Sequence, residues 1–89
     1  MDIEFDPAMS DRNLAERGFG FAFAARIFSG PVALFEDTRR DYGEVRMIAI
    51  GEIDGVLYKV VFTDRGGIRR IISANRASRQ EKRLWPPSA

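Results

Sequence analysis

Apolar and polar residues alternate over positions 1–5. This period of two is typical of a half-buried strand. Asp6-Pro7 follows, and an aspartate before a proline is typical of a helix N-cap and first helical position. We expect this helix to continue to about Arg17 and to end at Gly18. Its few apolar residues predict that it lies at the surface.

Helical spacing (i, i+3, i+4, i+7) recurs in residues 20–28, at Phe21, Ala24, Ala25 and Phe28. It predicts a second helix that ends at Gly30-Pro31. The small alanine side chains would allow close approach to a sheet, and the aromatic side chains are candidates for the core.

Residues 31–43 combine a short apolar run with a charged stretch, and they predict a connector. Three strand patterns follow, at Val45–Ile50, Val56–Thr63 and Ile68–Ala74. Asp54-Gly55 and Gly66-Gly67 separate these patterns, and both dipeptides are typical of tight hairpin turns. We therefore expect a three-stranded antiparallel meander.

Ser78 and Glu81 have the spacing of a capping box, which predicts a short last helix ended by Pro86-Pro87. The element order is then β-α-α-β-β-β-α. The expected class is α+β: an antiparallel sheet of about four strands, with two N-terminal helices packed on one face. The N-terminal strand should pair at one edge of the meander or beside it, and residues 1–89 should form a single domain.

The chain contains neither cysteine nor histidine. This composition excludes disulfides, thiolate metal sites and the general base that enzymes use most often. We expect no cofactor and no metal ion. The acidic start and the lack of a long apolar run predict a cytoplasmic protein without a signal peptide or a membrane span.

Positive charge is concentrated near the end of the chain. Residues 65–89 carry seven basic residues and one acid, a net charge of +6, whereas residues 1–64 carry seven bases and twelve acids, a net charge of −5. Such a block is expected for a protein that binds a polyanion or an acidic partner. A solvated surface explains the same block equally well.

Several short motifs together resemble one family over nearly the whole chain. They are Phe5-Asp6-Pro7, Asn13-Leu14, Gly18, Asp41-Tyr42-Gly43-Glu44-x-Arg46, Ile50-Gly51, Phe62-Thr63-x-Arg65 and Arg70-Ile71-Ile72-Ser73-Ala74-x-x-Ala77-Ser78-x-x-Glu81. Their order and spacing are similar to those of the BrnT toxins. The resemblance implies a RelE-like fold and a ribonuclease that inhibits translation and growth. It also implies a cognate ribbon-helix-helix antitoxin, a heterotetramer of the two proteins, operator DNA bound only through the antitoxin, and no membrane partner.

The chain departs from the family pattern at four positions. Met9 stands where members usually carry lysine, Arg17 where they carry histidine, Asn75 where they carry arginine, and Trp85 where they carry tyrosine. The first three departures leave an alternative open: a degenerate toxin that binds its antitoxin and regulates its operon with little nuclease activity. A general RNA-binding module without a partner gene is a third possibility.

Metal-independent cleavage of RNA needs a base for the ribose 2′-hydroxyl, positive charge for the phosphorane and a proton for the leaving oxygen. Without histidine, the carboxylate of Glu44 or Glu81 is the expected base, although capping is a sufficient reason for Glu81. Arg65 and Arg70 complete the predicted catalytic set, because a guanidinium stays charged and binds phosphate through two bonds.

The predicted RNA-binding residues are Arg46, Arg76, Arg79, Tyr42 and Trp85. The two aromatic rings would stack on unpaired bases, although Trp85 could equally cover the edge of a small core.

Strand alternation predicts that Arg70 and Ile72 share one sheet face, while Ile71 and Ser73 share the other. It also predicts that Arg46 lies on the same face as the isoleucines of its strand.

Overall fold

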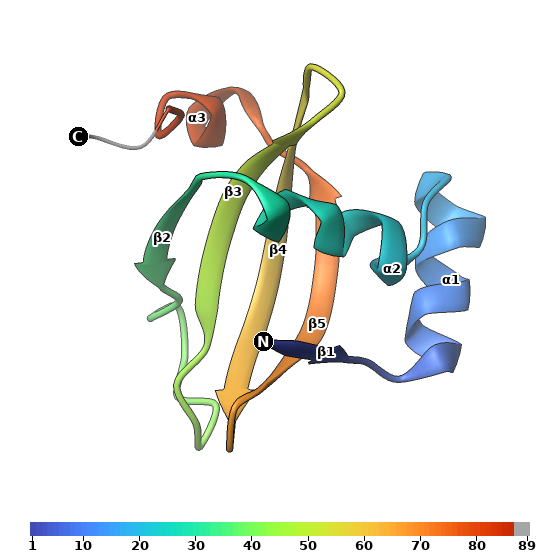
Figure 1. Ribbon diagram of the computed structural model, residues 1–89. Helices are drawn as coiled ribbons and strands as arrows, with labels where there is room; N and C mark the ends of the chain where they lie inside the picture. Colours follow the sequence, from blue (N-terminus) through green and yellow to red (C-terminus); the bar gives the residue numbers. More distant parts are fainter. Residues whose placement is uncertain (87–89) are drawn as a thin grey trace.

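A computed structural model of the protein describes residues 1–86 (Figure 1). The elements in chain order are β1 (Asp2–Glu4), α1 (Pro7–Arg17), α2 (Phe21–Ala24), the 3-10 helix η1 (Ala25–Ser29), β2 (Val32–Glu36), β3 (Met47–Ile53), β4 (Val56–Arg65), β5 (Ile68–Arg76) and α3 (Arg79–Lys82). The expected α+β class is confirmed.

The sheet has five strands in the order β1-β5-β4-β3-β2. The sheet differs in two details from the expected antiparallel sheet of about four strands. Residues 32–36 of the expected connector form β2, which pairs antiparallel with β3, and β1 pairs parallel with β5. The apolar run of β2 is too short to show by itself which strand it pairs with. A RelE-like fold stays a prediction.

Both expected hairpins are present. Asp54 and Gly55 have φ angles of 50° and 83°, and Gly66 and Gly67 have φ angles of 56° and 82°. Two successive positive φ angles favour glycine and match the right-handed twist of the strands that they join.

A β-bulge interrupts the pairing of β4 with β5. Phe62 pairs with Ile71 and Val61 with Ser73, so Ile72 has no partner in β4. Ile72 packs against the same cluster as Val61. The expectation that Ile72 and Ser73 lie on opposite faces is therefore wrong, because an extra residue in one strand resets the alternation.

The two sheet faces are covered differently. On one, here called the α2 face, α2 and η1 cross the strands and enclose the larger core, which includes Phe21, Ile27 and Phe62 (Figure 1). The other, here called the α3 face, has a smaller cluster that includes Ile48 and Val61. α1 lies beside β5 (Figure 1).

The second helix is shorter than expected. Its first turn is α-helical and the remainder, residues 25–29, is 3-10 helix. This segment lies very close to β3, because a Cβ atom added to Gly51 would be only 2.7 Å from Cβ of Ile27. Glycine at this position allows the close contact.

The local signals at the other helix ends are confirmed. The Asp6 carboxylate accepts a hydrogen bond from the Ala8 amide, and Gly18 ends α1 with a φ of 87°. The capping box of Ser78 and Glu81 is present in α3, which ends at Lys82. The helix thus ends before Pro86, not at the expected Pro86-Pro87 stop, and Pro87 is outside the described residues. None of the helices in residues 1–86 has the length and apolar character needed to cross a bilayer.

Candidate functional site

A concave pocket of about 200 Å³ lies on the α3 face, near the turn between β4 and β5. We call it the arginine pocket. Its lining residues are Met9, Glu44, Arg46, Arg65, Arg70, Ile71 and Ile72. Strand alternation explains the gathering of the arginines: Arg65 is two residues beyond Thr63, and Arg70 pairs with Thr63. Arg46 was predicted to lie on the same face as the isoleucines of its strand, and Ile48 and Ile50 belong to the cluster on the α3 face.

Glu44 is the central acid of the arginine pocket. Its carboxylate forms ion pairs with Arg65 and with Arg46, whose Nε lies 3.9 Å from Glu44 Oε2. The third guanidinium belongs to Arg70, whose Nη1 lies 3.4 Å from Oε1 of Glu4 in β1. The Arg65 side chain is 60% exposed and that of Arg70 is 35% exposed. Partly exposed ion pairs are weak, so both groups can exchange their partners for an incoming anion.

Tyr42 contacts Arg46 but is not itself a lining residue of the arginine pocket. Its ring lies against the guanidinium of Arg46, with 4.0 Å between the ring centroid and Cζ. Its hydroxyl donates a hydrogen bond to the buried carboxylate of Asp37, at 3.2 Å. The guanidinium of Arg40 also lies over this ring, with 6.0 Å between its Cζ and the centroid, so two cations already approach the ring on which a base is predicted to stack.

Asp37 holds Tyr42 in place through this hydrogen bond, and the sequence analysis did not identify Asp37 as a site residue. It accepts two side-chain hydrogen bonds from Arg39, each 2.8 Å long. The Arg39 guanidinium holds the pKa of Asp37 far below its ordinary value, despite the opposing effect of burial. In the sequence, Asp37 was only one of several charged residues in the expected connector, and this pattern does not show which of them is buried.

Glu81 lies in a different hollow, of about 440 Å³, together with Lys59 and Asp37. Its carboxylate accepts a hydrogen bond from the Ser78 amide at 2.7 Å and lies 3.0 Å from Lys59 Nζ. Burial raises the pKa of Glu81, but the Ser78 amide and the Lys59 ammonium outweigh burial and the pKa is lowered. The structure thus gives Glu81 a capping and ion-pairing role and does not bring it into the arginine pocket.

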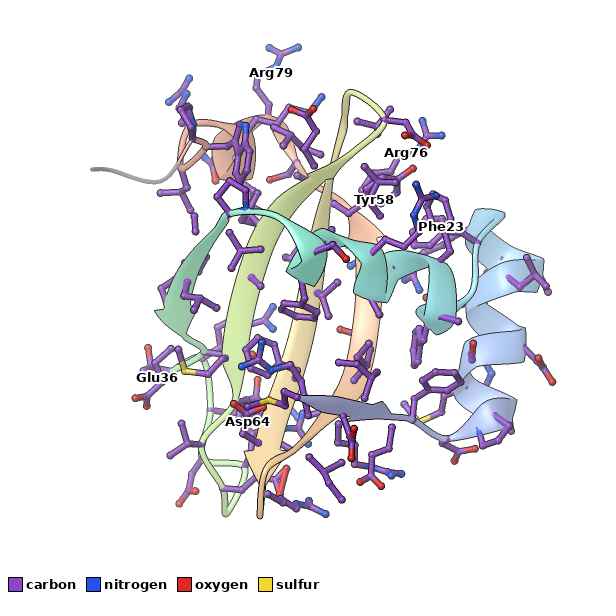
Figure 2. The ribbon with its side chains drawn as sticks, in the orientation of Figure 1. Phe23, Glu36, Tyr58, Asp64, Arg76 and Arg79 are labelled. Carbon is purple, nitrogen blue, oxygen red and sulfur yellow. The ribbon has the colours of Figure 1, made fainter. Side chains whose placement is uncertain are left out.

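The other predicted RNA-binding residues lie outside the arginine pocket. Arg76 pairs with Tyr58 and lies on the α2 face. Arg79 is the first residue of α3 and projects outward from that helix (Figure 2). Trp85 packs against the smaller cluster, which agrees with its alternative reading as cover for the core. The basic block is therefore divided between the two faces and α3.

The departures from the family pattern occupy distinct environments. Met9 contributes an apolar side chain to the wall of the arginine pocket. Arg17 donates a hydrogen bond to Asn13 at 2.9 Å. The Oδ1 atom of Asn75 is buried and has no hydrogen-bond partner within residues 1–86. Only Met9 of these three borders the arginine pocket.

Comparison with known proteins identifies a family. No curated protein matches the chain. The family model described as "ribonuclease toxin, BrnT, of type II toxin-antitoxin system" matches residues 5–81, a span that contains every residue of the arginine pocket. The chain therefore belongs to the BrnT family, the ribonuclease toxins of type II toxin–antitoxin systems.

Proposed function

We propose that this chain is a metal-independent endoribonuclease that cleaves RNA in the arginine pocket, in the cytoplasm, and that a cognate antitoxin neutralises it. The observation that carries the proposal is the gathering of three guanidinium groups and one carboxylate in a single concave site. Arg46 precedes β3, Arg65 ends β4 and Arg70 belongs to β5, so three separate segments place the charges.

Each group has a role in this proposal. The Glu44 carboxylate accepts the proton of the ribose 2′-hydroxyl, which then attacks the adjacent phosphorus. Arg65 and Arg70 bind the phosphate oxygens and stabilise the negative charge of the phosphorane. Arg46 stays between Tyr42 and Glu44 and orients the carboxylate. A guanidinium does not lose its proton, so water in the open pocket protonates the leaving 5′-oxygen.

Growth arrest and cleavage of purified RNA test the proposal together. Arg65→Ala and Arg70→Ala should each lower the cleavage rate by about 100-fold or more, as expected for loss of a group that stabilises transition-state charge. The matched control is Arg26→Ala, because Arg26 is also an exposed, ion-paired arginine but is paired with Asp54. Excess EDTA should leave the rate unchanged. Full activity of both pocket variants would remove the pocket from the mechanism.

A second candidate function is a degenerate toxin that binds its antitoxin and regulates its operon with little cleavage. The apolar side chain of Met9 in the wall of the arginine pocket favours it, because no fourth cation is supplied there. Purified wild-type protein separates the two candidates: a defined cleavage pattern on RNA supports the ribonuclease, whereas antitoxin binding without cleavage supports the degenerate toxin.

We also propose that the antitoxin is of the ribbon-helix-helix type and that two toxins assemble on an antitoxin dimer. The family assignment supports an antitoxin partner. Light scattering on the co-expressed pair measures the stoichiometry, and a mass other than that of two toxins with two antitoxins would contradict the heterotetramer.

A further inference from the structure

A hollow of about 370 Å³ lies on the α2 face, at the end of α1 and beside the C-terminal end of β5. We call it the aromatic hollow, and its principal residues are Leu14, Arg17, Phe19, Phe23, Tyr58 and Arg76. Figure 2 shows Phe23, Tyr58 and Arg76 grouped at this end of the sheet, while Asp64 lies at the opposite end. The aromatic hollow shares no lining residue with the arginine pocket.

The floor of the aromatic hollow is apolar and firmly packed. Tyr58 is buried, and its ring makes edge contacts with Phe19 and Phe23 at centroid distances of 5.1 and 5.6 Å. Leu14 forms an apolar lip that is 55% exposed. An apolar side chain from a partner would gain buried area here without any rearrangement of the floor.

The rim of the hollow is cationic. Within residues 1–86, neither Arg17 nor Arg76 has a carboxylate within ion-pair distance. Of the ten other arginines, four also have none in this part of the chain, whereas six each have one: Arg26, Arg39, Arg46, Arg65, Arg69 and Arg70. The hydrogen bond from Arg17 Nη1 to Asn13 holds that guanidinium at the rim, and Asn13 in turn donates to the Phe19 carbonyl. The remaining guanidinium N–H groups can donate hydrogen bonds to the carboxylates of a partner.

We propose that the aromatic hollow is the docking site for an acidic segment of the antitoxin, which places one apolar side chain on Phe23 and Tyr58 and flanking carboxylates on Arg17 and Arg76. This inference rests on the proposed function only in taking the antitoxin as the partner. The exposed leucine and the edge-packed rings favour an aliphatic or aromatic side chain of a protein over stacked RNA bases. The antitoxin segment and the RNA then bind on opposite faces of the sheet.

Calorimetric titration with the purified cognate antitoxin, which we expect to be the product of the adjacent reading frame, tests the docking site. Leu14→Glu and Arg76→Glu should each weaken binding by at least about tenfold. Leu14→Glu would bury a charge at the contact, and Arg76→Glu would reverse the charge at the rim. Arg79→Glu, a matched charge reversal on α3, should change the affinity by less than about threefold. The Leu14→Glu variant should keep its fold, since the side chain is exposed, and should cleave RNA like the wild type.

Every outcome bears on the proposal. Wild-type affinity in both Leu14→Glu and Arg76→Glu, or no binding of the adjacent product to the wild type, would overturn it. Loss of RNA cleavage in Leu14→Glu with antitoxin binding intact would assign the hollow to RNA instead. Arg70→Ala separates this inference from the ribonuclease proposal, because it should lose cleavage and keep antitoxin affinity.

Discussion

Arg69 and Arg70 are adjacent in β5 and lie on opposite faces of the sheet. The Arg69 side chain is 18% exposed, makes two hydrogen bonds to Asp64 and lies over the rings of Phe28 and Phe62. The Arg70 side chain is 35% exposed and has one long contact, 3.4 Å, to Glu4. The comparison shows how the alternation of side chains along one strand gives identical residues different environments. Arg69 packs against the core, and Arg70 remains available to an anion.

The largest expected effect is on the α2 face. Phe62→Ala removes a fully buried ring that packs against Phe28 and supports Arg69. It should lower the free energy of unfolding by about 3–5 kcal/mol. Arg70→Ala, on the α3 face, should change it by less than about 0.5 kcal/mol. Denaturant unfolding measures both, and equal losses would show that the two faces do not differ in this way.

Arg69→Ala is a smaller perturbation of the same face. Loss of the paired hydrogen bonds to Asp64 and of the contacts with two rings should cost about 1–2 kcal/mol of stability. At a temperature where the variant is folded, its RNA cleavage rate should equal that of the wild type. A cleavage defect as large as that of Arg70→Ala would contradict the assignment of Arg69 to packing.

Asp37→Asn tests whether the ionised Asp37 carboxylate stabilises the folded protein on the α3 face. The pKa of Asp37 is lower in the folded protein than its ordinary value of 3.8, so its ionised form contributes stability above about pH 4. That contribution is lost as the pH falls below 3.8 toward the folded-state pKa. The wild type should therefore lose stability more steeply than Asp37→Asn between pH 5 and pH 2, while Glu81 affects both proteins alike. If thermal melts gave the two proteins the same dependence of stability on pH, the stabilising role of ionised Asp37 would be contradicted.

The smallest expected effect comes from Met9→Lys, in the wall of the arginine pocket. A fourth cation near Arg46, Arg65 and Arg70 should raise the cleavage rate by up to about tenfold through charge stabilisation. Met9 is 40% exposed, so the fold should not change. Ala8→Lys, also in α1 but outside the pocket lining, is the control. A slower Met9→Lys enzyme would show that this wall needs an apolar side chain.

The sequence was most informative where the deciding interactions are local. The N-cap of α1, its end at Gly18, the two hairpin turns and the capping box of α3 each depend on residues a few positions apart. Their side chains and φ preferences act without help from the remainder of the chain, so pattern is sufficient to place them. The motif spacing was likewise enough to name the family.

Only the tertiary structure decided which charges meet. Pairing with β3 makes residues 32–36 a strand, and the bulge at Ile72 turns Ser73 to the face opposite the expected one. Glu81 and Lys59 come together across distant segments, and Glu44 lies between Arg46 and Arg65. The basic block was visible in the composition, but its division between the faces depends on strand register, and register is fixed by contacts between residues far apart in the chain.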